Sequence, residues 1–210
     1  MVPHQRSLLV FGEPGVSPDA GFTRVPLDER SWVDVARNWL RGADDVLDVL
    51  MGEVDWHQGR RRMWERVVDD PRLSHWYRDG QELPHPCFHA VRAALEARYR
   101  VELSTVGLNY YRDGNDSVAP HADRELRDLD ETIVAIVTFG SRRPFLLRPK
   151  TAEHGRLRRS LDLCPASGDL LVMGGACQAG WEHAVPKVTR AGPRISATWR
   201  WARRTERAAG

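Results

Sequence analysis

The sequence is poor in cysteine and lacks a long apolar stretch. Its three cysteines, Cys87, Cys164 and Cys177, are odd in number and widely spaced, so they do not suggest a disulfide framework. The N-terminal apolar run, Leu-Leu-Val-Phe at 8–11, is too short for a signal-peptide core or a membrane span. We therefore expect a cytoplasmic protein of a reducing compartment that does not contact a membrane.

The sequence also lacks a strong charge imbalance, internal repeats and low-complexity tracts. A formal net charge of +2 gives no strong whole-molecule attraction to polyanions, so any nucleic-acid contact depends on local basic clusters. Ten basic residues are candidates for such clusters, and the alternative is that each is a solvated surface charge. They are Arg60, Arg61, Arg62, Arg142, Arg143, Arg148, Lys150, Arg156, Arg158 and Arg159. With 210 residues, 41% of them hydrophobic, we expect a monomer with a single domain and one core.

The N-terminal half has apolar residues at helical spacing. Residues 31–42 are predicted to form a helix that Ser31 caps, because tryptophan, valine, alanine and leucine recur there every three or four positions. The acidic and apolar residues of 44–51 predict a second short helix. A further helix is expected to begin near Pro86.

From about residue 103 the apolar spacing changes to two. Val106, Leu108 and Tyr110 share one face of a predicted strand, and Asn109 and Tyr111 share the other. Further strands, separated by glycine, proline and aspartate turns, are expected at 132–140, 144–148, 160–164, 169–174 and 194–202. This pattern predicts an α+β fold that is mainly β. We expect a double-stranded β-helix (a jelly roll, cupin-like) with N-terminal helices packed on one side.

A candidate metal site begins with Pro-His-Ala-Asp-Arg-Glu at 120–125. If this segment is extended, His121, Asp123 and Glu125 share one face, and the first two can bind one metal ion. His183 is a candidate third ligand from a later strand. Two histidines and one carboxylate on one side of a metal leave positions open for a bidentate cosubstrate and dioxygen, as in non-haem iron(II) oxygenases. A zinc hydrolase is the competing interpretation.

The last predicted strand favours the oxygenase. Arg194, Ser196 and Arg200 share a face that points away from the apolar layer, toward the site. Because guanidinium groups pair bidentately with carboxylates, a small dicarboxylate such as 2-oxoglutarate would satisfy both arginines. Asn109 and Tyr111 would add hydrogen bonds from their own strand.

The sequence resembles the AlkB-type Fe(II)- and 2-oxoglutarate-dependent dioxygenases, which oxidatively dealkylate nucleic-acid bases. The matching segments are PRLSHWY (71–77), LNYYRDGNDSVAPHADRE (108–125), TFGSRRPFLLR (138–148), GDLLVMGGACQAGWEHAVPK (168–187) and PRISATWR (193–200). The resemblance covers roughly residues 54–201. It implies an N-terminal extension with helices (1–53), a nucleotide-recognition lid with a supporting helix (54–102), a catalytic jelly-roll core (103–202) and a tail (203–210).

The resemblance also implies roles for individual residues. The iron(II) ligands would be His121, Asp123 and His183. The 2-oxoglutarate site would comprise Asn109, Tyr111, Arg194, Ser196 and Arg200, with Arg194 on the distal carboxylate. Glu125 would lie near the alkylated base. That base would stack between His121 and one of Trp56, Trp76 or Tyr77. Phosphate contacts would come from Arg60, Arg61 and Arg62.

Two positions depart from the family pattern. Ser196 stands where relatives usually have asparagine, which could loosen the hydrogen bonding around the arginines. Arg78 stands where a glycine usually follows Tyr77, with Gly80 two residues later. This second departure concerns the lid, and hence substrate choice.

The implied activity is oxidative demethylation of N-alkylated bases in single- or double-stranded DNA, with release of formaldehyde, succinate and carbon dioxide. Lesions such as 1-methyladenine and 3-methylcytosine block pairing, which makes the base easier to flip, and they are cationic, which suits Glu125. Two alternatives stay open. One is the same chemistry on RNA or a small alkylated metabolite, and the other is a catalytically silent, cupin-like metal-binding module.

Overall fold

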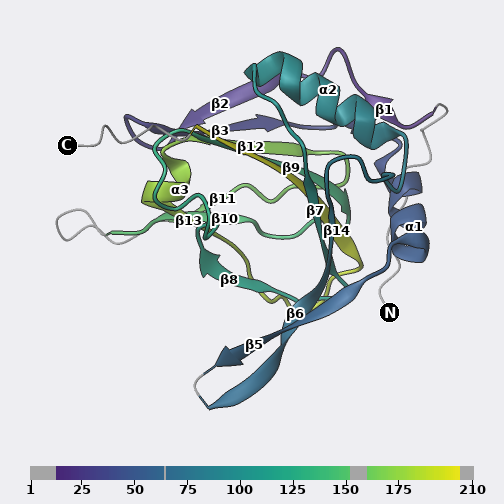
Figure 1. Cartoon of the computed structure of the whole chain (residues 1–210), viewed down its shortest axis with the longest axis vertical. Helices are drawn as coiled ribbons and strands as arrows, with labels where there is room; N and C mark the ends of the chain where they lie inside the picture. The colour runs from purple at the N-terminus through teal and green to yellow at the C-terminus, as the bar shows by residue number, and fades with distance from the viewer. Residues whose placement is uncertain (1–12, 64, 152–159, 204–210) are drawn as a thin grey trace.

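The protein is built from antiparallel β-sheets, with its two longer helices on one side of the larger sheet (Figure 1). The computed structural model describes residues 13–63, 65–151 and 160–203. In them, an eight-stranded sheet has the order β2-β3-β12-β9-β14-β7-β6-β5, and a four-stranded sheet has the order β11-β10-β13-β8. Two short strands, β1 and β4, pair with each other.

The bounds of the elements are as follows. The strands of the larger sheet are β2 Phe22–Pro26, β3 Ser31–Ala36, β5 His57–Met63, β6 Arg66–Tyr77, β7 Val106–Tyr111, β9 Thr132–Gly140, β12 Leu170–Gly175 and β14 Arg194–Ala202. Those of the smaller sheet are β8 Val118–His121, β10 Leu146–Pro149, β11 Leu161–Asp162 and β13 Trp181–Val185. The remaining elements are β1 Gly15–Val16, β4 Leu40–Arg41, α1 Ala43–Glu53, α2 Cys87–Tyr99 and α3 Cys177–Gly180.

Both faces of the larger sheet are covered by other parts of the protein, as the burial of β9 shows. All nine residues of β9 are buried. Val137 and Phe139 join an apolar cluster that includes residues of α1 and α2, whereas Val134 and Ile136 belong to a second cluster between the two sheets. A strand covered on both faces needs apolar residues at every position, which explains the unbroken apolar run of 132–140. The predicted mainly-β fold with helices on one side is confirmed.

The predicted alternation of faces is also confirmed in β7 and β14. Leu108, Ile195 and Trp199 are buried in the cluster beneath the helices. Their neighbours Tyr111 and Arg194 face the other way and line a cavity between the sheets. The helices predicted at 44–51 and after Pro86 correspond to α1 and α2.

The helix predicted over 31–42 is wrong, because Ser31–Ala36 is the strand β3 between β2 and β12. Val33 lies in the cluster between the sheets, while Ala36 lies in the cluster beneath the helices. A strand buried on both faces has apolar residues on either side, so its spacing also fits a helix, and pairing with distant strands decides between them.

Four strands of the larger sheet come from the N-terminal half, and two of them extend the sheet beyond the core. β5 and β6 form a hairpin that projects from the body of the molecule (Figure 1). β6 also pairs with β7, with Trp76 opposite Gly107. The segment expected to act as a lid is therefore a continuation of the sheet that carries Asn109, Tyr111, Arg194 and Arg200.

The contact between α2 and the larger sheet depends on Phe88. Its side chain is fully buried, and its ring centroid lies 6.0 Å from that of Phe139 and 5.7 Å from that of Trp199. We expect Phe88→Ala to lower the free energy of unfolding by about 3–5 kcal/mol, because it leaves a cavity that the neighbouring rings fill only partly. Urea denaturation of the ligand-free protein measures this change. The control, Val67→Ala, truncates a side chain that is 66% exposed and should change the value by less than about 0.5 kcal/mol. Equal losses in the two variants would contradict this view of the core.

Candidate active site

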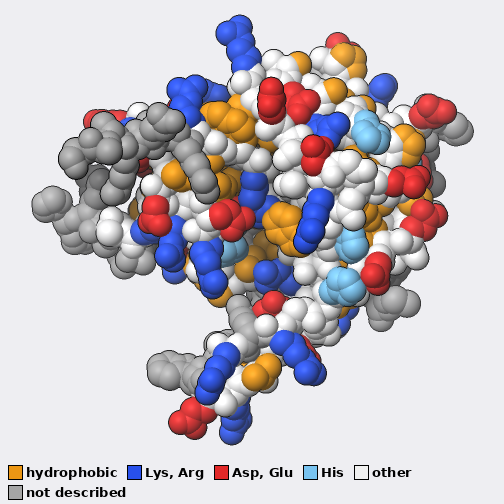
Figure 2. Space-filling view, viewed as in Figure 1, with side chains coloured by type: hydrophobic (Ala, Val, Ile, Leu, Met, Phe, Trp, Pro, Cys, Tyr) orange, Lys and Arg blue, Asp and Glu red, His pale blue; other side chains and the backbone are white. Residues whose placement is uncertain are grey.

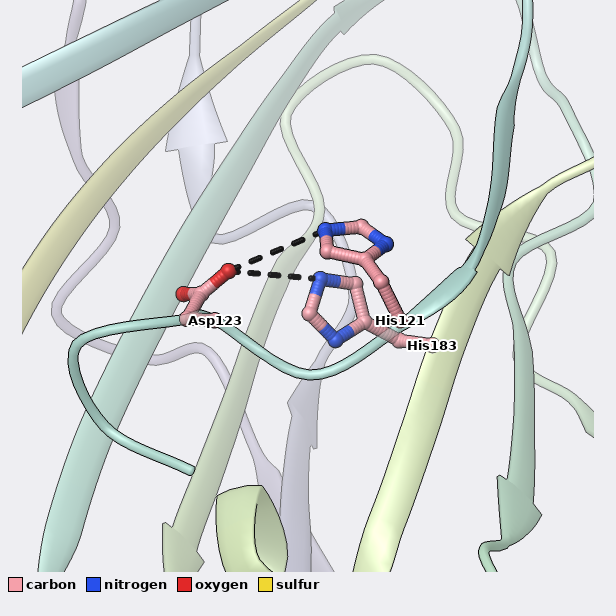
Figure 3. Close-up of side chains that lie close together, drawn as sticks. All are labelled: His121, Asp123 and His183. Carbon is pink, nitrogen blue, oxygen red and sulfur yellow. Dashed lines mark ion pairs between the residues drawn. The ribbon is translucent and has the colours of Figure 1, made fainter. Parts of the chain in front are cut away.

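Three side chains from the smaller sheet and the turn beside it converge on one point (Figure 3). His121 ends β8 and lies directly opposite His183 of β13 in the pairing of these strands. The Nε2 atoms of His121 and His183 lie 3.8 Å and 3.9 Å from Oδ1 of Asp123. One nitrogen or oxygen from each residue lies within 4.8 Å of the others, close enough for all three to bind the same ion.

Asp123 reaches this point from a turn and not from a strand. β8 ends at His121, and the amide of Leu126 donates to the carbonyl of Asp123 at 2.9 Å, closing a turn. The expectation that His121, Asp123 and Glu125 share one face of an extended strand is therefore wrong. The aspartate backbone is held instead by Gln178, whose side-chain oxygen accepts from the Asp123 amide at 2.9 Å.

Hydrogen bonds orient the ligand atoms. Nδ1 of His121 lies 2.9 Å from the carbonyl of Ala119, which leaves Nε2 as the metal-facing atom. Oδ2 of Asp123 accepts from Nε of Arg200 at 2.7 Å, so Oδ1 is the oxygen that faces the histidines. The ring of His183 stacks on Phe145 with 5.7 Å between centroids.

The ionisation of His183 and Asp123 suits a divalent cation. Burial, assisted by the neighbouring His121, lowers the pKa of His183 to about 3, so its imidazole is neutral. Burial alone would raise the pKa of Asp123, but the charge and hydrogen bond of Arg200, together with the two neighbouring histidines, outweigh burial, and the pKa of this carboxyl is lowered. Because metals bind neutral imidazole and ionised carboxylate, His183 and Asp123 are in their metal-binding forms at neutral pH.

Two arginines of β14 point into the same cavity. Arg194 is buried, and its Nη2 donates to Oγ1 of Thr138 at 3.3 Å. Among the residues that the structure describes, its Nε and Nη1 are buried without a hydrogen-bond partner, as is Nη1 of Arg200. Burial lowers the pKa of Arg194 to about 10, which still leaves it charged at neutral pH. Buried cationic donors without partners are destabilising, so their geometry fits an anion, and a pair of them fits a dicarboxylate.

The cavity unites most of the residues predicted from the sequence. Its volume is about 230 Å³. The predicted residues that line it are Asn109, Tyr111, His121, Asp123, Glu125, His183, Arg194, Ser196, Arg200 and Trp76. Within this set, Glu125 and Trp76 are exposed, whereas Asp123, His183 and Arg194 are buried.

Two of the three aromatic candidates lie elsewhere. Trp56 donates from its Nε1 to the carbonyl of Leu50 at 3.1 Å and packs against Tyr110. Tyr77 packs against the apolar cluster beneath the helices. Because alternate residues of β6 face opposite sides, Trp76 lines the cavity and Tyr77 does not.

The predicted basic residues fall into different environments. Arg60 and Arg62 are exposed on the β5–β6 hairpin, where basic side chains cover much of the surface (Figure 2). Arg61 lies on the same strand, and its side chain is outside the described part of the structure, as are Arg156, Arg158 and Arg159. Arg142 is exposed, while Arg148 and Lys150 are half-buried.

Arg143 does not belong to a surface cluster, because its side chain is only 1% exposed. Its guanidinium donates to the carbonyls of Asp113, Asp116 and Pro186 at 2.7–3.0 Å. These bonds join the loop before β8 to the segment after β13. Arg143 therefore holds together the ends of the two strands that carry His121 and His183.

Sequence reasoning also missed Arg72 and Gln178. Arg72 lines the cavity and donates from Nε to Oδ1 of Asn109 at 2.9 Å. Its position, at an even spacing from Ser74 and Trp76 within the segment 71–77, was a usable signal. The contact of Gln178 with Asp123 could not be foreseen, because it joins residues 55 positions apart.

Sequence comparison with known proteins identifies relatives that use iron and 2-oxoglutarate, as their names state. The sequence profile of the 2OG-Fe(II) oxygenase superfamily matches residues 40–206. The mouse alpha-ketoglutarate-dependent dioxygenase alkB homolog 3 is 31% identical over 184 residues, which are 77% of this chain and 62% of the mouse protein. Its human counterpart is 32% identical over 211 residues, covering 90% of this chain and 69% of the human protein. The mouse DNA oxidative demethylase ALKBH2 is 33% identical over 152 residues, covering 69% of this chain and 63% of that protein.

The fold is shared with more distant proteins. A prolyl hydroxylase from Trichoplax adhaerens, solved with a hypoxia inducible factor peptide, superposes with a TM-score of 0.58 at 12% identity, covering 80% of this chain and 82% of that one.

No helix among residues 13–63, 65–151 and 160–203 has the length and apolarity to cross a membrane.

The converging histidines and aspartate thus lie within the matched range, as do the two arginines with unpaired donors. The zinc alternative loses its basis, since the profile is that of iron(II) enzymes that use 2-oxoglutarate. The chain spans about 55–69% of the length of its alkB homolog 3 relatives. It belongs to the 2OG-Fe(II) oxygenase superfamily as an AlkB homologue, and its two histidines and aspartate fit the iron(II) and 2-oxoglutarate that the family implies.

Proposed function

We propose that this dioxygenase demethylates N-alkylated bases in DNA, of the 1-methyladenine and 3-methylcytosine type. The observation that carries the proposal is that one cavity joins the metal ligands to an exposed indole, Trp76, and an exposed carboxylate, Glu125. The name of the mouse relative ALKBH2, a DNA oxidative demethylase, supports the same substrate class.

Each part of the cavity has a role in this reaction. His121, Asp123 and His183 hold the iron, and Arg194 and Arg200 pair with the carboxylates of 2-oxoglutarate, assisted by Asn109, Tyr111 and Ser196. Bound iron(II), with 2-oxoglutarate and dioxygen, supplies the oxidation that hydroxylates the N-methyl group, so that formaldehyde, succinate and carbon dioxide are released. The burial of Arg194, Asp123 and His183 keeps bulk water away from this end of the cavity.

The exposed end of the cavity receives the base. An enzyme of this kind must take its target out of the duplex or act on a single strand. The base then stacks on Trp76, and the Glu125 carboxylate favours a base that carries a positive charge. The β5–β6 hairpin acts as the lid, with Arg60 and Arg62 near phosphates.

We expect the chain, reconstituted with iron(II) and supplied with air and 2-oxoglutarate, to convert an oligonucleotide containing 1-methyladenine into repaired DNA and an equal amount of formaldehyde. Asp123→Ala should abolish both products, lowering the rate by at least about 100-fold, because the carboxylate ligand is removed. Asp128→Ala is the matched control, since that carboxylate follows in the same segment and is 87% exposed. Succinate formation without repair by the unaltered chain would indicate a different primary substrate.

A second prediction concerns the buried cation. We expect Arg194→Met to raise the KM for 2-oxoglutarate by about 30-fold or more, because a charged group that pairs with a buried carboxylate is removed. The same change should leave the ligand-free protein as stable or more stable, because an unpaired buried charge is replaced by a side chain of similar length. Succinate formation as a function of 2-oxoglutarate concentration, together with urea denaturation, measures both effects. Arg190→Met, at an exposed arginine, should change neither.

A third prediction separates a nucleic-acid substrate from a small metabolite. If arginines pair with phosphates, the logarithm of the oligonucleotide affinity should fall linearly with the logarithm of the salt concentration, with a slope that reports the number of phosphates neutralised. Replacing Arg60 and Arg62 together with alanine should reduce that slope by about 1 for each arginine that pairs with a phosphate. Fluorescence anisotropy at a series of salt concentrations measures it. The free 1-methyladenine nucleoside is the control, and a similar salt dependence for both ligands would contradict phosphate recognition.

A further inference from the structure

The position of the Trp76 indole depends on Gly107, a residue of the neighbouring strand that has no side chain. In the pairing of β6 with β7, Trp76 lies directly opposite Gly107. A Cβ atom added at Gly107 would lie 2.9 Å from Cη2 and Cζ3 of Trp76 and 3.0 Å from Cζ2. Real Cβ atoms essentially never lie so close to other atoms. The six-membered ring of the indole therefore occupies the space that any other residue at 107 would fill.

The backbone does not require glycine at this position. The described glycines with positive φ are Gly42, Gly80, Gly140, Gly168 and Gly175, and Gly107 is not among them. It lies inside a regular strand, where glycine is less stable than alanine by about 0.5–1 kcal/mol. A tryptophan ring covers this glycine, as the Trp32 ring covers Gly174 of β12, an arrangement known to compensate for glycine in sheets.

The ring that Gly107 accommodates lies at the active site. Trp76 is 49% exposed, although one side of its ring lies over the Gly107 backbone. The guanidinium of Arg200 lies 4.9 Å from the ring centroid, and the same guanidinium holds Oδ2 of Asp123. The height of the indole above β7 therefore sets the distance between the ring and the metal ligands.

We propose that Gly107 is a specificity-determining positioning residue, which seats Trp76 low on the sheet and so leaves room for a planar base between the indole and the metal ligands. This inference rests on the proposed function, because the ligand of the slot is the alkylated nucleobase. A side chain at 107 would push the indole away from β7 and change the width of the slot. None of the residues assigned to iron and 2-oxoglutarate would itself be replaced.

The test uses Gly107→Ala and Gly107→Val in the enzyme loaded with iron(II) and 2-oxoglutarate. Binding of an oligonucleotide with one 1-methyladenine is measured by fluorescence anisotropy without oxygen, and turnover is measured in air. We expect Kd and KM for the oligonucleotide to rise about 5-fold or more, and further for valine, since base stacking on an aromatic ring accounts for about 5- to 150-fold in affinity. The kcat at saturating oligonucleotide, the KM for 2-oxoglutarate and the midpoint of urea unfolding should change little.

Two further variants make the test specific. In a Trp76→Ala background, Gly107→Ala should have no additional effect on the oligonucleotide Kd, because the two residues act through one contact. Gly52→Ala is the matched control, since a Cβ there meets no atom within 4 Å. Its Kd and KM for the oligonucleotide should equal those of the unaltered enzyme.

Three results would overturn the inference. These are an unchanged oligonucleotide Kd in both Gly107 variants, an equal loss in the presence and absence of Trp76, or a parallel loss of 2-oxoglutarate affinity that indicates damage to β7. If the unaltered chain forms succinate but neither binds nor repairs the alkylated oligonucleotide, the proposed function itself fails, and this inference fails with it.

Discussion

The ion pair between Arg200 and Asp123 is the contact on which the metal site depends. A carboxylate has two equivalent oxygens, and a facial site needs only one of them. Arg200 holds Oδ2 at 2.7 Å, and Oδ1 is thereby directed at Nε2 of His121 and His183. Because Asp123 lies in a turn, strand pairing does not hold it in place. Instead, the Arg200 guanidinium fixes its carboxylate, and the Gln178 side chain fixes its backbone amide.

The same cavity contains buried positive charge that destabilises the ligand-free protein. Within the described residues, three guanidinium nitrogens of Arg194 and Arg200 are buried without hydrogen-bond partners, which opposes folding. The apolar layer between the larger sheet and the helices offsets this penalty, since it is fully buried around Phe88, Phe139 and Trp199. An anionic cosubstrate would therefore meet guanidinium groups whose positions the strand pairing of β14 already fixes. Such preorganisation favours binding more than new contacts on a mobile surface would.

One continuous sheet connects the arginine end of the cavity to the Trp76 end. β14 contributes Arg194 and Arg200, β7 contributes Asn109 and Tyr111, and β6 contributes Trp76. The hydrogen-bonded register of three adjacent strands thus places the Trp76 indole relative to the arginines. The distal part of the hairpin projects beyond this sheet and carries exposed arginines away from the cavity (Figure 1, Figure 2).

Much of the fold and of the site was predictable wherever the signal was local. Alternation along β7 and β14 correctly separated Leu108, Ile195 and Trp199 from Tyr111 and Arg194, because the side-chain period of a strand depends only on its own backbone. The prediction failed where an element depends on distant partners. Ser31–Ala36 became a strand because β2 and β12 flank it. Arg143 became buried because it donates to three carbonyls, two from the loop before β8 and one from the segment after β13.

By itself, the sequence determined which three residues are the candidate metal ligands and on which face of β14 the arginines lie. Only the tertiary structure decided which residues meet across strands, such as His121 with His183 and Trp76 with Gly107. The physical reason is that hydrogen-bond register between strands far apart in the chain is set by the packing of the whole sheet. No local pattern of residues records it.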